Sequence, residues 1–438
     1  MKIIKWDTHD IKLRLSLMKN WPSQDIRKVQ KEIEGIIDNI MAHGDIALFN
    51  YTKLFESYKI DKNTVRVSRN DLDLAWNKVS VSDRRIIQFA AKRIERFHKK
   101  QLPRSFKLKK DQQEILEQRI MPLTRVGICI PAGKAPLFST VLMTAIPAKI
   151  AGVREIAMIS PWPNGKMNPY ILAAAKVAGI SEIYKVGGAQ GVAALACGTQ
   201  SIAKVDKIVG PGNIWVSYAK SMVAREGWVD IDTVAGPSEI VVIADKSCPP
   251  SFIAADLLSQ LEHGDDSRAI LITPDYQCAN SVLKEIQMQK ELYGKQKYLK
   301  RAREFLAIAI ITKDLEEALE AANWLSPEHL EILVEAPRRV LSKIRNAASI
   351  FIGPYSPVPI GDYLAGPNHV LPTEGRARFA SPLGVEDFVK RQSVVEFSKE
   401  ALMKLGPIAE RMAELEGLDG HAAAIRIRRE SLSKKKKV

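Results

Sequence analysis

Apolar residues recur at helical spacing along the first part of the chain. Residues 26–47 carry isoleucines at positions 33, 36, 37 and 40, and residues 82–97 have a similar stripe. A stripe with a period near 3.6 residues predicts a helix with one buried face. We therefore predict a mostly helical N-terminal region over residues 1–122.

From residue 123 the pattern alternates between short β-rich runs and helical stretches. Strands that end in turns are predicted at 126–131, 155–160, 182–188 and 207–213, with helices at 140–151, 171–178 and 189–196. This alternation is typical of a parallel sheet covered by helices. The glycine-rich turns then lie at the carboxyl edge of the sheet, where open α/β sheets bind ligands.

A second series of the same kind follows. Strands are predicted at 239–245, 269–275, 308–312, 330–335 and 349–353, and helices at 252–262, from 279, and at 314–325. Residues 385–391 and 402–415 return to helical patterns. The predicted fold is α/β, with parallel-sheet domains over 123–236 and 237–381 and a helical C-terminal segment over 382–438.

Composition restricts the class of protein. The chain has 438 residues, of which 46% are hydrophobic, so more than one domain is expected. It has no apolar run of the roughly 18 residues that a membrane span needs, and its first residues lack the apolar core of a signal peptide. Four scattered cysteines predict free thiols, so we expect a cytoplasmic protein.

The net charge of +15 raises the hypothesis of a nucleic-acid partner. However, residues 426–438 hold seven basic residues and one acidic residue, which we interpret as a solvated chain end. The other charges are dispersed, without an aromatic and basic stripe, so neither a nucleic-acid nor a membrane partner is predicted. A mildly positive surface would also attract an anionic dinucleotide.

Some polar residues could form a metal site. Gln260 and His263 lie three apart on a predicted helix and share one face. Asp362 and His421, both near turns, could complete a nitrogen and oxygen ligand set for zinc or another first-row metal. Spacing alone is a weak signal, because a lone histidine on a helix is more often a surface or capping residue than a metal ligand.

Other residues could carry catalysis or bind ligands. Glu328 and His329 are an adjacent acid and imidazole, suited to proton transfer, although the two residues alone favour a solvated loop pair. VGGAQ (186–190) and VGPGN (209–213) allow close approach of a ligand to the backbone, or are ordinary tight turns. Neither is G-x-G-x-x-G. Ser238 in AGPSE could face a cleft, but no G-x-S-x-G elbow of a serine hydrolase is present.

In their order along the chain and in their amino-acid sequence, these segments resemble the histidinol dehydrogenase family. Between about residues 123 and 428 the matching strings are APLFSTVLM, VGGAQ, KVDKIVGPGN, AGPSE, DLLSQLEHG, SPEHL, GDYLAGPNHVLPT and EGLDGH. The resemblance implies two incomplete Rossmann-like domains and an intertwined homodimer. It also implies zinc-dependent oxidation of L-histidinol through histidinal to L-histidine, with two NAD⁺ and one water, at the end of histidine biosynthesis.

The resemblance assigns roles to individual residues. Glu328 and His329 match the catalytic acid–base pair, and Gln190 and Asn213 match contacts to NAD. The implied zinc ligands are Gln260, His263, Asp362 and His421, the last of which serves the neighbouring chain. The substrate-binding positions are these four ligands together with Ser238, His329, His369 and Glu416.

Two positions depart from the family pattern on the NAD side. Cys129 stands where a tyrosine that contacts the nucleotide is usual, so we expect looser NAD binding. Ala132 replaces a glycine of the following turn, so we expect the backbone conformation there to differ from the family's. An alternative is a paralogue that oxidises another small alcohol, such as a sulfonated diol. Glu416 favours histidinol, because a carboxylate attracts a cationic substrate and repels a sulfonate.

Overall fold

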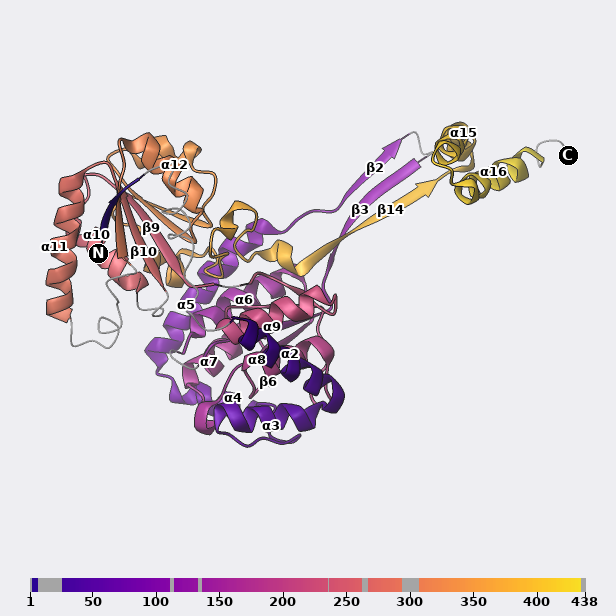
Figure 1. Cartoon of the computed structure of the whole chain (residues 1–438). Helices are drawn as coiled ribbons and strands as arrows, with labels where there is room; N and C mark the ends of the chain where they lie inside the picture. The colour runs from indigo at the N-terminus through magenta and orange to yellow at the C-terminus, as the bar shows by residue number, and fades with distance from the viewer. Residues whose placement is uncertain are drawn as a thin grey trace. The chain divides into compact units, whose positions relative to one another are not determined.

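The computed structural model describes residues 2–6, 26–110, 114–132, 136–234, 236–261, 267–293 and 307–434. The chain forms two compact units. The first contains Met1–Gln101 and Leu123–Phe388, and the second contains Leu102–Pro122 and Val389–Val438. Two parallel sheets belong to the first unit, and an antiparallel sheet with two helices belongs to the second (Figure 1).

A five-stranded parallel sheet confirms the first predicted series. Its strands, in the order β6-β5-β4-β7-β8, are β4 (Arg125–Cys129), β5 (Glu155–Ile159), β6 (Glu182–Tyr184), β7 (Lys207–Val209) and β8 (Asp230–Ile231). Its connecting helices are α6 (Phe138–Ala151), α7 (Pro169–Ala178), α8 (Gly188–Cys197) and α9 (Ile214–Arg225). The glycine turns therefore follow β6 and β7 at the carboxyl edge, as predicted.

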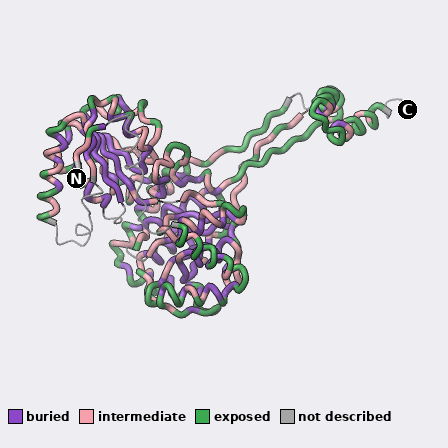
Figure 2. The backbone as a smooth tube through the Cα atoms, viewed as in Figure 1, coloured by how far each residue is buried: buried purple, intermediate pink, exposed green. Residues whose placement is uncertain are grey.

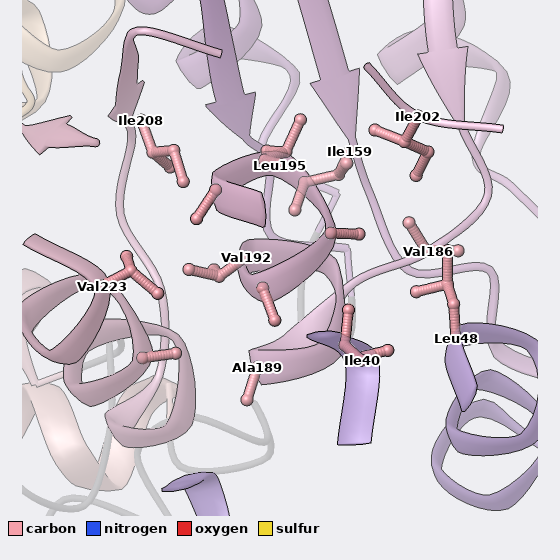
Figure 3. Close-up of a cluster of buried hydrophobic side chains, with 14 of the residues drawn as sticks. Ile40, Leu48, Ile159, Val186, Ala189, Val192, Leu195, Ile202, Ile208 and Val223 are labelled. Carbon is pink, nitrogen blue, oxygen red and sulfur yellow. The ribbon is translucent and has the colours of Figure 1, made fainter. Parts of the chain in front are cut away.

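The N-terminal helices complete the core of this sheet. Helix α8 is rich in Ala and Gly, and lies between the strands and helices α2 (Ile26–His43) and α3 (Asp45–Glu56), as Figure 3 shows. Ile40 and Leu48 contribute from one side, and Ile159 and Ile208 from the other. Full burial of each such side chain contributes about 1.5–3 kcal/mol. On the same unit, α4 (Arg69–Lys78) packs on α7, and α5 (Val81–His98) packs on α6 and α7.

The second parallel sheet has six strands, in the order β1-β11-β10-β9-β12-β13. They are β1 (Lys2–Lys5), β9 (Glu239–Ala244), β10 (Arg268–Thr273), β11 (Ala307–Ile311), β12 (His329–Leu333) and β13 (Ser349–Ile352). β1 was not predicted: it adds an edge strand from the N-terminal region, which we expected to be helical.

Helices cover both faces of this sheet. α10 (Pro250–Gln260) and α11 (Tyr276–Tyr293) pack on the face of Val242 and Leu271, and α12 (Leu315–Leu325) and α13 (Pro337–Val340) on the face of Val241. The central strands are therefore buried along their length (Figure 2). Beyond β13 come short turns of helix: α14 (Val358–Ile360), Gly361–Ala365, Arg376–Arg378 and Val385–Phe388.

The second unit corrects two predictions. β2 (Phe106–Lys110), β3 (Glu114–Pro122) and β14 (Val389–Phe397) form an antiparallel sheet, followed by α15 (Lys399–Leu415) and α16 (Asp419–Lys434). The predicted helix over 385–391 is wrong beyond residue 388, because the chain from Val389 pairs with β3 along its whole length.

Residues 426–434 lie in a helix rather than in a free chain end, although most of them are exposed to solvent as expected. These residues continue helix α16, where Arg426 and Arg429 bind the carboxylate of Glu410 on α15. Residues 435–438 lie outside the described residues. The four cysteines are free, as predicted, and no helix in the described ranges is long and apolar enough to cross a membrane.

Candidate active site

The acid–imidazole pair lies where strand β12 begins. His329 is the first residue of β12 and pairs with Ile240 of β9 and Ser349 of β13, and Glu328 immediately precedes it. Glu328 is 6% exposed and His329 is 4% exposed. The alternative of a solvated loop pair is therefore wrong, and the pair sits at the amino edge of the six-stranded sheet.

The backbone of Glu239 holds both members of the pair. Its N–H donates to Glu328 Oε2 at 2.8 Å, and its carbonyl oxygen lies 3.1 Å from His329 Nδ1. Because a carbonyl only accepts, Nδ1 of the neutral ring carries the proton and Nε2 carries the lone pair. Ser238 lies directly before β9, as predicted.

Asp362 reaches the same place from the segment after β13. Its Oδ1 lies 3.9 Å from His329 Nε2, and its backbone carbonyl accepts a 2.8 Å hydrogen bond from His369 Nδ1. His369 Nε2 is then the acceptor for Thr140 Oγ1 of α6 at 3.4 Å. The predicted residues Ser238, Glu328, His329, Asp362 and His369 therefore gather around the start of β9 and β12.

This edge concentrates carboxyl groups. Burial raises the pKa of Glu328 well above its ordinary value, and the charges of Glu239 and Asp362 raise it further. Burial alone raises the pKa of Asp362 to about 7. Burial also raises the pKa of Glu239 to about 7, although Arg268 opposes this. Because a bound cation would offset the cost of these buried negative charges, the site is suited to a metal ion or a cationic substrate.

Gln260 belongs to the same edge by topology. Helix α10 returns from the end of β9 to the start of β10, so its last residue, Gln260, lies where the strands begin. Gln260 is 1% exposed, and its Nε2 has no hydrogen-bond partner in the described part of the chain. A buried amide without a partner costs about 1–3 kcal/mol, and turning the amide over would present Oε1 to a ligand instead.

The structure does not test the positions of the other predicted metal ligands, His263 and His421, relative to this site. The helix predicted to residue 262 ends at Gln260, and His263 lies outside the described residues. His421 lies in α16, Glu416 follows α15, and both belong to the second unit with exposed side chains. Among the residues that the structure describes, no group of three His, Cys, Asp or Glu side chains forms a metal site.

The predicted NAD contacts lie on the five-stranded sheet. Gln190, in the first turn of α8, is 2% exposed, and Asn213 caps α9 by accepting a hydrogen bond from Val216 N at 3.2 Å. Gly210 has φ +107°, and a Cβ there would lie 2.4 Å from the carbonyl oxygen of Cys129, so only glycine fits. Cys129 is itself 4% exposed, and burial raises the pKa of its thiol to about 12.

Sequence reasoning missed Glu56 at this edge. Its carboxylate accepts hydrogen bonds from Trp162 N at 2.7 Å and from Gly187 N at 2.8 Å. These partners are 106 and 131 residues away along the chain, so no local pattern indicates the contact. Glu56 belonged only to the N-terminal region over 1–122 that was predicted to be mostly helical, outside the two stripes at 26–47 and 82–97.

These features define a class of protein before they define a family. Two helix-covered parallel sheets, with glycine turns at one edge and a buried acid–imidazole pair at another, are typical of an α/β enzyme. Comparison with known proteins then assigns the family. The histidinol dehydrogenase family profile matches residues 19–429, and the chain belongs to the histidinol dehydrogenase family of NAD-dependent oxidoreductases.

Individual relatives match over nearly the whole chain. The histidinol dehydrogenase of Listeria innocua is 47% identical over 428 residues, which are 98% of this chain and 99% of the relative. That of Aquifex aeolicus is 44% identical over 400 residues, which cover 91% and 92%. The crystal structure of histidinol dehydrogenase from Elizabethkingia anophelis matches with a TM-score of 0.91 at 36% identity and covers 99% of each chain.

Proposed function

We propose that this chain oxidises L-histidinol through histidinal to L-histidine, reducing two NAD⁺ and consuming one water at the end of histidine biosynthesis. Membership of the family supports the reaction. The observation that supports the chemistry is that the backbone of Glu239 forms hydrogen bonds with both Glu328 and His329. These contacts orient the acid and the base before any substrate binds. Such preorganisation lowers the cost of reaching the transition state.

The two oxidations need different proton acceptors. NAD⁺ takes one hydride in each oxidation. In the first, His329 Nε2 takes the hydroxyl proton of histidinol as the aldehyde forms. In the second, the carboxylate of Glu328 takes a proton from the water that adds to the aldehyde. The raised pKa of Glu328 makes its ionised form a stronger base than an exposed glutamate.

Zinc is the metal that the family resemblance implies, and the residues fit it. Gln260, His263 and Asp362 would hold it, with the partner subunit's His421 as the fourth ligand. The largely buried carboxylate of Asp362 and the buried amide of Gln260, without a hydrogen-bond partner in the described ranges, support this assignment. The ion would keep the imidazole and amine of the substrate in register with His329.

A homodimer would complete each active site. The antiparallel sheet of the second unit exposes apolar side chains, which are Phe106, Leu108, Leu116, Val394, Val395 and Phe397. A small sheet with exposed apolar residues needs a covering surface, which a second copy of this chain would supply. Glu416 and His421 would then serve the partner's site, where Ser238 and His369 bind substrate. Gln190 and Asn213 remain the proposed NAD contacts.

The stoichiometry of NADH tests this function. Complete conversion of a known amount of L-histidinol should release two NADH per molecule, and a ratio of one would show a simple alcohol dehydrogenase. A sulfonated diol is the matched control substrate, and we expect no turnover, because the carboxyl groups at the site repel an anion. Removal of the metal with a chelator should abolish turnover of histidinol while NADH still binds.

A further inference from the structure

A single carboxylate connects two turns at the carboxyl edge of the five-stranded sheet. Glu56 is the last residue of α3 and is 9% exposed. Its Oε2 accepts the N–H of Trp162, in the turn after β5, and its Oε1 accepts the N–H of Gly187, in the turn after β6. Hydrogen bonds from N–H groups to an ionised carboxylate are roughly twice as strong as those between neutral groups.

Close packing beside the Glu56 carboxylate restricts the conformations of the two turns. A Cβ on Gly187 would lie 2.8 Å from Pro161 Cβ, so the turns pack against each other directly. Gly187 is also the N-cap of α8, an end of a helix that favours a negative charge. Gln190 Nε2 lies 3.5 Å from Glu56 Oε1. The orientation of the Gln190 amide therefore depends on Glu56 as well.

We propose that Glu56 is a positioning residue for the dinucleotide, because its carboxylate fixes the turns after β5 and β6 and the amide of Gln190. The inference rests on the proposed placement of NAD beside Gln190 and Asn213. Glu56 contacts neither substrate nor cofactor in this scheme. Glu56 thus links the N-terminal helices to the cofactor site, and it does not contact the acid–imidazole pair on the other sheet.

Variants at this position separate positioning from general stability. Glu56→Gln keeps the size of the side chain but offers only one acceptor, and Glu56→Asp keeps the charge on a shorter side chain. Lys53→Ala is the matched control, an exposed residue of the same helix. The dissociation constant of NADH is measured by its fluorescence on the zinc-loaded enzyme. Histidinol affinity is measured by calorimetry. Both are taken at pH 8, above the pKa of about 7 to which burial raises Glu56.

We expect Glu56→Gln to raise the NADH dissociation constant about tenfold, which corresponds to about 1.4 kcal/mol, because one of the two turns loses its charge-assisted hydrogen bond. Glu56→Asp should weaken NADH binding less than Glu56→Gln does. Lys53→Ala should bind NADH as tightly as the wild type. Histidinol affinity and zinc content should stay within about twofold of the wild type, a selectivity that a general loss of folding would not produce.

Gln190→Ala distinguishes the ways in which the idea fails. If Gln190→Ala weakens NADH binding while Glu56→Gln does not, the inference about Glu56 is overturned and the cofactor placement stands. If neither substitution changes NADH affinity, the placement of NAD on this sheet is itself overturned. Equal losses of NADH and histidinol affinity in Glu56→Gln would assign the residue to folding alone, against the proposal.

Discussion

The buried ion pair between Lys220 and Asp232 holds the glycine turn that precedes Asn213. Lys220 is 1% exposed, binds the carboxylate of Asp232, and donates to the carbonyl oxygen of Gly210 at 2.9 Å. Asp232 Oδ2 accepts the N–H of Gly210 at 2.7 Å. Both polar groups of Gly210 are therefore satisfied by the pair, and we predict that breaking it destabilises this part of the first unit.

The magnitude follows from the burial of both charges. Lys220→Met leaves the Asp232 carboxylate buried without its cation, and Asp232→Asn leaves a buried ammonium without its anion. Each change should lower the free energy of unfolding by about 3–5 kcal/mol. The double variant buries no charge, so it should cost less than the sum of the single variants, with a coupling of at least about 2 kcal/mol.

Urea unfolding of the four proteins, followed by far-ultraviolet circular dichroism, measures this coupling. NADH affinity of the same proteins shows whether the turn at Gly210 has moved, and we expect both single variants to bind NADH more weakly than the wild type. If the costs of the two substitutions add within about 0.5 kcal/mol, Lys220 and Asp232 do not act as a pair and the reasoning is refuted.

Three further predictions concern the acid–base pair and the dimer. Glu328→Gln should slow oxidation of histidinal by about 10²–10⁴-fold and that of histidinol much less; equal losses in the two half-reactions would contradict its role as the base for water. In Glu239→Gln, the pH dependence of stability should weaken. A carboxyl with its pKa raised to about 7 contributes stability below pH 4.5 that is lost as pH rises through 7. For this one group the loss is up to about 3 kcal/mol between pH 5 and pH 8. If urea unfolding gives the same pH dependence of the unfolding free energy for metal-free wild type and variant, Glu239 does not contribute in this way. Heterodimers of a His421→Asn chain with a His329→Asn chain should recover up to about half of wild-type activity, since one site would then be intact; no recovery in verified heterodimers would mean that each site is built from one chain.

Local periodicity predicted every strand of the two parallel sheets except β1 and β8, each of which lies at an edge. The runs that became β9, β10 and β12 are fully buried, and a continuous apolar run is a strong signal for a central strand. β1 has only four residues, and its partner β11 lies some 300 positions away. β14 is exposed along most of its length, so it lacks the alternation of buried and exposed positions that marks a half-buried strand.

The sequence singled out the residues that gather around the start of β9 and β12, but not their geometry. Glu328 and His329 stand out as neighbours, yet their burial depends on the strands on either side of β12. Gln260 appeared to share a helical face with His263, whereas helix α10 ends at Gln260. Glu56 could not be found at all, because backbone amides, which every residue carries, are its partners.

The positions of Glu328 and His329 do not depend on the side chain at position 239. Glu239 holds Glu328 and His329 through its N–H and its carbonyl, and these groups are present whatever side chain stands at position 239. Their position depends on the pairing of β9 with β10 and β12 rather than on the carboxyl group of Glu239. Glu239→Gln should therefore change the pH dependence of stability while His329 keeps its tautomer. In contrast, Glu239→Pro removes the N–H that binds Glu328 and should impair the oxidation of histidinal even if the fold survives.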